Sequence, residues 1–236
     1  MRLGLRAVGS ACAQVFSHLA LLFGGNVLAM LLSLPIVLVS IVVASFVHSL
    51  SVVPLGIAVL IGVLPNPACM GLQTLARELA LGNAPEFGEQ RQALGTYWRV
   101  GLRAWLIAAA ITIILALNAA FYAREAANPA SGLHAVAAPL FFVWALLLLF
   151  WLGIHLYVAP LLLAQEEPRV LLAYRNAAVI MLSRPLTSWT VILIWLGALV
   201  LTSATAVATV IGLALAASIQ QNALRLFLPD ALPAHD

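Results

Sequence analysis

The chain has 236 residues, of which 64% are hydrophobic and only 8% are charged, and its mean hydropathy is +1.09. A water-soluble domain carries about a quarter charged residues, so this chain has too little polar surface to cover a globule in water. We therefore predict an all-α polytopic membrane protein that forms one transmembrane bundle and leaves no room for a separate soluble domain.

The formal net charge is +3, and all eleven basic residues are arginines. A nucleic-acid-binding domain gathers such residues into a basic stripe, whereas these arginines are scattered between apolar segments. No nucleic-acid partner is expected. The arginines are better interpreted as topology signals, and the lipid bilayer is the first expected partner.

Residues 1–18 form the first segment. Its polar face consists of Arg2, Arg6 and Ser10, at helical spacing. The opposite, apolar face consists of Leu3, Leu5, Val8 and Cys12. This pattern is typical of an interfacial helix on the membrane surface. A frayed basic tail is the alternative.

Long apolar runs then fill residues 19–225, before a short polar tail at 226–236. The last run, 187–218, would be roughly 48 Å long as one straight helix, against a hydrocarbon core of about 30 Å. Small polar residues at 202–205 interrupt this run, so we divide it. The result is six spans, with five as the alternative: about 19–47, 52–75, 104–122, 136–164, 187–202 and 205–221.

The arginines orient these spans. With six spans, every arginine except Arg124 falls on the same side of the membrane. Because positive loops remain in the cytoplasm, that side is predicted to be cytoplasmic, together with both termini.

Two of the predicted cytoplasmic loops carry arginines that could contact lipid phosphates or a protein partner. Arg99 and Arg103 stand one helical turn apart in the first loop, and Arg175 and Arg184 lie in the second. Simple anchoring of the topology is the alternative interpretation.

Polar residues within spans are candidates for function. Asn26, Asn66 and His155 are all predicted in the cytoplasmic half of the bundle, where they could form an inward-facing polar site that binds a solute or carries a proton. Asn118 lies late in the third span. Hydrogen bonding between helices is the alternative role for each of them.

Prolines predict helix breaks at Pro35 and at Pro65 and Pro67. Each removes a backbone donor and disfavours helical geometry at the preceding residue. After Pro67, which suits the first turn of a helix, the chain can restart as a second helix that leads through Arg77 into the cytosol.

No catalytic motif is present in the sequence. We find no His-Glu-x-x-His, Gly-x-Ser-x-Gly or phosphate-binding glycine loop, and no acidic residue within a predicted span. We therefore expect no enzyme activity, no cofactor and no metal.

Short motifs along nearly the whole chain resemble the YesL-like family of bacterial integral membrane proteins, a family whose domain has no assigned function. They are Asn26 with Leu32-Ser33-Leu34-Pro35, Leu64-Pro65-Asn66-Pro67-Ala68, Arg77 with Leu81-Gly82, Tyr97-Trp98-Arg99, Tyr157-Val158-Ala159-Pro160-Leu161, Arg175-Asn176-Ala177 and Ser183-Arg184-Pro185. The family typically has glycine or phenylalanine where this chain has Asn66, so the resemblance assigns no shared role to that residue.

The resemblance implies a bacterial plasma-membrane protein that is an accessory to solute uptake, with carbohydrate as the implied solute class. A membrane-transport complex is then the expected protein partner. The alternative hypothesis is a small transporter or channel that uses Asn26, Asn66 and His155.

Overall fold

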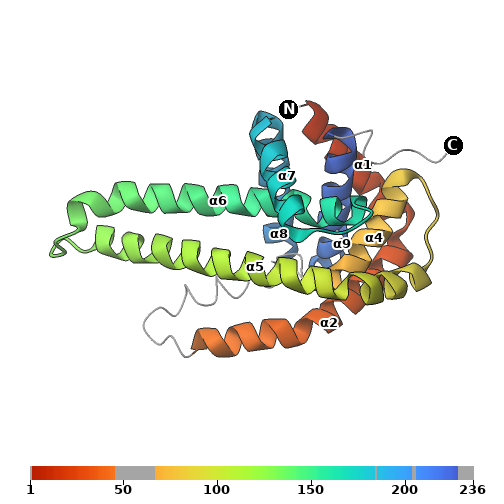
Figure 1. The fold of residues 1–236 in the computed structure, drawn as a ribbon, viewed down its shortest axis with the longest axis horizontal. Coiled ribbons are helices and arrows are strands. Elements are labelled where there is room, and N and C mark those ends of the chain that lie inside the picture. The colour runs from red at the N-terminus through yellow and green to blue at the C-terminus, as the bar shows by residue number, and fades with distance from the viewer. Residues whose placement is uncertain (1, 46–66, 184, 204–205, 228–236) are drawn as a thin grey trace. The chain divides into compact units, whose positions relative to one another are not determined.

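A computed structural model describes the backbone of residues 2–45, 67–183, 185–203 and 206–227 (Figure 1). No strand occurs within these ranges, which confirms the predicted all-α class. The helices are α1 (Arg2–Ser17), α2 (Leu19–Ser45), α4 (Pro67–Leu81), α5 (Phe87–Ala127), α6 (His134–Ala164), α7 (Val170–Ser183), α8 (Pro185–Ser203) and α9 (Ala206–Phe227).

The chain forms two compact units. Unit 1 consists of Met1–Ser33, Pro65–Ala104 and Gly153–Asp236, and unit 2 consists of Leu34–Leu64 and Trp105–Leu152. The long helices α2, α5 and α6 therefore each contribute residues to both units.

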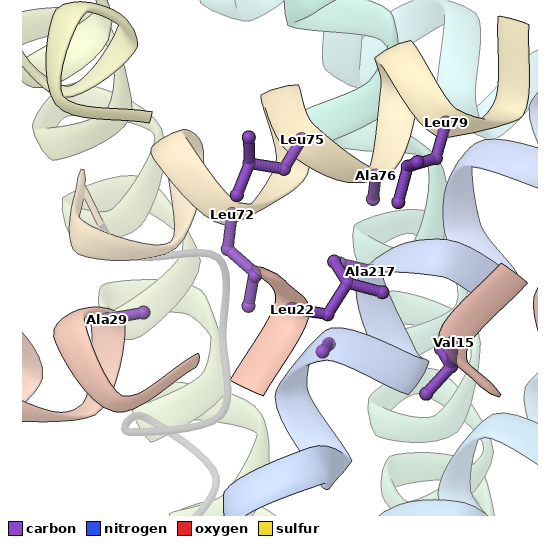
Figure 2. Close-up of a cluster of buried hydrophobic side chains, with 9 residues drawn as sticks. Val15, Leu22, Ala29, Leu72, Leu75, Ala76, Leu79 and Ala217 are labelled. Carbon is purple, nitrogen blue, oxygen red and sulfur yellow. The ribbon is translucent and has the colours of Figure 1, made fainter. Parts of the chain in front are cut away.

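The hydrophobic core of unit 1 joins four helices (Figure 2). Its buried side chains come from α1, α2, α4 and α9: Val15, Leu22, Ala29, Leu72, Leu75, Ala76, Leu79, Ala214 and Ala217. The α4 members recur at helical spacing, so one face of α4 turns toward α2 and α9.

The last helix, α9, is enclosed by protein on every side over much of its length. Every residue from 216 to 224 is buried, and α9 packs against α1, α4 and α8. Ala214, Ala217 and Ala223 are small enough for neighbouring helices to approach closely. This C-terminal helix is therefore central to the packing of unit 1.

Helix α4 has well-defined signals at both ends. Pro67 is its first residue, where a missing N–H costs no hydrogen bond. At its C-terminus Gly82 has a φ of 89°, and the N–H groups of Gly82 and Asn83 donate to the carbonyl oxygens of Leu79 and Glu78 at 3.1 and 2.9 Å. This is a Schellman motif, which satisfies carbonyls that the helix end would leave unpaired.

In unit 2, α5 and α6 form an antiparallel hairpin (Figure 1). Ala108 and Leu152 form a small core with Trp105 and Leu148 packed against it. Trp151 Nε1 donates to Thr112 Oγ1 at 3.1 Å. Side chains facing away from this seam are large, apolar and exposed, as in Ile114, Phe142 and Leu146.

By length and composition, α5 and α6 can each cross a membrane, and up to four crossings result if each of two bent helix pairs makes one. The pairs are α1 with α2, which meet at 96°, and α7 with α8, which meet at 110°. These counts cover only the described residues and suggest a membrane protein. The six-span arrangement stays a prediction.

Several helix bounds differ from the sequence expectation. Helix α5 begins at Phe87, so residues 87–103, expected as a polar loop, continue directly into the helix that contains 104–122. A run of Glu, Gln and Arg is compatible with helix when one face is packed, as Gln90 and Ala93 are here.

The predicted helix breaks have different outcomes. Pro67 begins α4, while Pro65 and Asn66 lie outside the described residues. Helix α2 continues through Pro35 to Ser45. A proline inside a helix can bend it without ending it, so the break at Pro35 stays a prediction.

The segment expected at the membrane surface, α1, is helical, but its buried positions are Ala7, Ala11 and Val15. They recur every four residues and pack α1 against α9 and α8. Leu5 is 54% exposed. The interfacial position of α1 therefore stays a prediction, because its most buried face meets protein.

A substitution at Gly71 tests the close packing of α4 against α5. A Cβ at Gly71 would lie 2.7 Å from the backbone oxygen of Gln90, whereas one at Gly95, also within a helix, meets nothing within 4 Å. We expect Gly71→Ala to destabilise by about 1–3 kcal/mol through overpacking. Gly95→Ala should be neutral or stabilise by about 0.5–1 kcal/mol.

Thermal unfolding of the two variants in the same detergent, followed by circular dichroism, checks this expectation. Equal midpoints for Gly71→Ala and Gly95→Ala would show that α4 and α5 are not packed as closely as described.

Candidate functional site

Asn26 joins α2 to the buried helix α9 by a hydrogen bond. Its side chain is fully buried, and its Oδ1 accepts a hydrogen bond from the backbone N–H of Ala214 at 3.0 Å. Its Nδ2 contacts Met30 Sδ at 3.5 Å. A backbone N–H of α9 is thus bonded across to a neighbouring helix, so Asn26 acts as a link between helices.

His155 lies in the part of α6 that belongs to unit 1 and is 1% exposed. Its Nε2 is 3.2 Å from the hydroxyl of Tyr174 on α7, and that hydroxyl donates to the carbonyl oxygen of Ala104 on α5 at 2.9 Å. Because the tyrosine proton points to Ala104, its oxygen is left to accept from Nε2–H of His155. This chain of bonds connects α6, α7 and α5.

The predicted polar site is not brought together by these contacts. The described bonds of Asn26 lead to α9 and those of His155 to α7, while Asn66 lies outside the described residues. Asn118 is half-buried and donates to Ile114 O in its own helix at 2.7 Å. The joint site therefore stays a prediction.

A polar contact among the described residues of unit 1 joins α4 and α9 through three buried glutamines, which we call the amide network. Gln221 Nε2 donates to Gln73 Oε1 at 2.9 Å and to Gln73 O at 3.3 Å. Gln73 Nε2 in turn donates to Gln220 Oε1. All three side chains are at most 4% exposed.

Further bonds extend this contact to α1 and to the end of α4. Asn222 Nδ2 donates to Gln14 Oε1 at 2.7 Å, and Gln14 Nε2 donates to Leu79 O at 3.0 Å. Arg225 donates to Ala80 O. Side chains of α1 and α9 therefore bond to two of the last carbonyls of α4, those of Leu79 and Ala80.

The chemistry of this arrangement is that of neutral amides. Amides donate and accept hydrogen bonds but do not titrate or act as nucleophiles, so the amide network suits helix registration and polar recognition rather than acid–base catalysis. No group of three His, Cys, Asp or Glu side chains that could hold a metal is found among the described residues.

Three of the four arginines predicted to contact lipid or a protein partner lie on exposed sides of helices. Arg99 and Arg103 lie on the exposed side of α5, and Arg175 lies on the exposed side of α7. Arg184 lies outside the described residues. An exposed arginine can reach a phosphate or carboxylate without breaking an internal contact.

Sequence reasoning missed the amide network entirely. Gln73 lies within the predicted second span, and Gln220 and Gln221 lie in the predicted sixth span, so all three were polar residues at membrane depth. Applying to them the rule used for the asparagines would have identified them as interhelical contacts or functional candidates.

No family model, no curated protein and no solved structure matches this chain.

Replacing Gln73 tests the amide network. Gln73→Leu removes the donor to the Gln220 oxygen and leaves the Gln221 amide only its longer bond to the backbone oxygen of residue 73, so we expect a loss of about 1–3 kcal/mol in stability. Gln92→Leu, at an exposed position of α5, should change stability by less than about 0.5 kcal/mol.

A double-mutant cycle with Gln221→Leu sharpens the test. The double variant should lose less than the sum of the two single losses, with a coupling of about 0.6–1.7 kcal/mol. Thermal unfolding in detergent gives all four midpoints, and strictly additive losses would contradict the described pairing.

Proposed function

We propose that this protein is a non-enzymatic polytopic membrane protein that acts as an accessory to solute uptake. The observation that carries the proposal is that the buried polar side chains described in unit 1 bond chiefly to other helices. Asn26 bonds to Ala214, His155 to Tyr174, and Gln73 to Gln221.

The membrane location is supported by the outward faces of the hairpin in unit 2. The exposed side chains on these faces are mostly apolar, and Phe142 is 65% exposed and Leu146 60% exposed. Contiguous large apolar surface is rare on soluble monomers, whereas lipid tails solvate it well. Six spans with both termini in the cytoplasm remain the arrangement that we propose from the arginine distribution.

An accessory role needs a surface for a partner, and the exposed arginines supply a candidate. Arg99 and Arg103 lie on one exposed side of α5, near Trp98, which is 43% exposed. Arginine and tryptophan are enriched among residues that dominate binding energies at protein interfaces. We therefore propose this segment, residues 98–103, as the contact for a membrane-transport partner.

The solute class rests on sequence alone. The YesL-like resemblance implies a bacterial plasma-membrane protein linked to carbohydrate uptake, and we propose carbohydrate on that basis.

A second candidate function is a small transporter that moves its own solute. The observation in its favour is the buried chain His155–Tyr174–Ala104 O, because histidine can change its charge near neutral pH. An intramembrane histidine is a functional candidate by default.

The partner contact can be tested by affinity purification from native membranes with partner identification by mass spectrometry. We expect the wild-type chain to recover components of a solute-uptake system. The double variant Arg99→Gln, Arg103→Gln should recover them at about tenfold lower yield, which corresponds to about 1.4 kcal/mol.

Arg91→Gln is the matched control, because Arg91 is also exposed on α5, and its yield should equal that of the wild type. Recovery of the chain alone would count against the accessory role.

The transporter alternative is tested by solute flux into proteoliposomes that hold the purified protein. The accessory proposal expects equal flux for the wild type and His155→Ala, at the level of empty vesicles. A flux that the wild type supports and His155→Ala loses would overturn the accessory proposal.

A further inference from the structure

Helix α7 has two contrasting faces. Its inner face, made of Ala173, Tyr174, Ala177, Ile180 and Met181, is buried in unit 1. Its outer face is exposed and almost entirely apolar. Leu171 is 75% exposed, Val179 57% and Leu182 65%.

Helix α8 also has exposed apolar side chains. Leu186, in the first turn of α8, is 80% exposed, and Leu193 further along is 62% exposed. Exposing such side chains is unfavourable in water, at about 25 cal/mol per Å² of apolar surface. Lipid removes that cost for both helices.

The geometry distinguishes the two helices. Helix α7 has 14 residues, so it is roughly 21 Å long and too short to cross a hydrocarbon core of about 30 Å. It meets α8 at 110°. If α8 crosses the bilayer, α7 therefore lies close to the membrane plane.

Charged side chains lie within the outer face and just before the helix begins. Arg175 is exposed on α7, one helical turn from both Leu171 and Val179. Just before the helix, Arg169 pairs with Glu167 at 2.8 Å, and both side chains are largely exposed. A long arginine side chain can keep its stem among apolar groups while its guanidinium reaches the phosphates.

We propose that α7 is an interfacial helix whose outer face of Leu171, Val179 and Leu182 is inserted into the headgroup–acyl boundary of the membrane, with Arg175 on lipid phosphate. An amphipathic helix of this kind lies about 5–10 Å into that boundary. The inference rests on the proposed membrane location and adds the position of α7. It places the inner face of α7, including Tyr174, at the same level as the interface.

Spin-label depth measurements on the full chain in phosphatidylcholine–phosphatidylglycerol nanodiscs test the proposal. Nitroxides are attached at Val179 and Leu182, with Phe142 of α6 as the reference for a membrane-embedded side chain and Gln92 of α5 as the reference for an exposed one. Cys12 and Cys69 are first replaced by alanine. If that background does not fold, a keto amino acid at the same four positions carries the nitroxide and leaves the cysteines in place.

We expect the labels at Val179 and Leu182 to collide with oxygen more often than with a water-soluble nickel chelate, at a depth between those of Gln92 and Phe142. Contact with the chelate equal to that at Gln92 would mean that α7 faces water. A depth equal to that at Phe142 would make α7 part of a broken span. Protection from both reagents would mean that a protein covers the face. Each of these three results overturns the proposal.

The reference label at Phe142 separates the failure of the α7 proposal from the failure of the proposed membrane location. If Phe142 is accessible to oxygen while Val179 and Leu182 fail the test, only the position of α7 is wrong. If the Phe142 label itself collides freely with the chelate, the membrane location of the hairpin fails.

Discussion

Gln73 and Gln221 bring amide groups into the interior between α4 and α9, where neither lipid nor bulk water can solvate them. An unpaired buried amide costs about 1–3 kcal/mol, and the two side chains avoid much of that cost by bonding to each other. Pairing fixes α4 and α9 both in register and in rotation, because a slip of one residue would separate them. Asn222 and Arg225 extend the constraint to α1 and to the end of α4.

If unit 1 lies in a bilayer, as we propose, its polar contacts carry unusual weight, because apolar burial between helices stabilises little in lipid. Lipid tails are as apolar as leucine, so helices there associate through close packing and hydrogen bonds. Unit 1 uses both. Small residues such as Ala214 and Ala217 let α9 pack closely against its neighbours. Hydrogen bonds between amide side chains stabilise this packing. The hairpin of unit 2 has fewer polar contacts described, with Trp151 and Thr112 joining its helices.

The all-α class agrees with the prediction from hydropathy, which rested on the small share of charged residues in the chain. The restart at Pro67 also followed from local chemistry, since proline is suited to a first helical turn. The amide network did not follow. Gln73 and Gln221 are 148 residues apart, and their pairing depends on how α4 and α9 pack, which no local pattern encodes. The joint site around Asn26, Asn66 and His155 stays a prediction, since a similar predicted depth does not determine which helix faces which.

The hydrogen bonds of Asn26 and His155 also affect where binding of a solute or a partner costs the least free energy. A solute that used Asn26 or His155 would first have to replace a bond to Ala214 or Tyr174, and a broken bond leaves a buried polar group without its partner. The exposed arginines of α5 carry no such cost, because a phosphate or carboxylate can accept bidentate bonds from them without first replacing a bond to another helix. Recognition at Arg99 and Arg103, as we propose it, therefore breaks no described bond between helices, whereas recognition at Asn26 or His155 would break one.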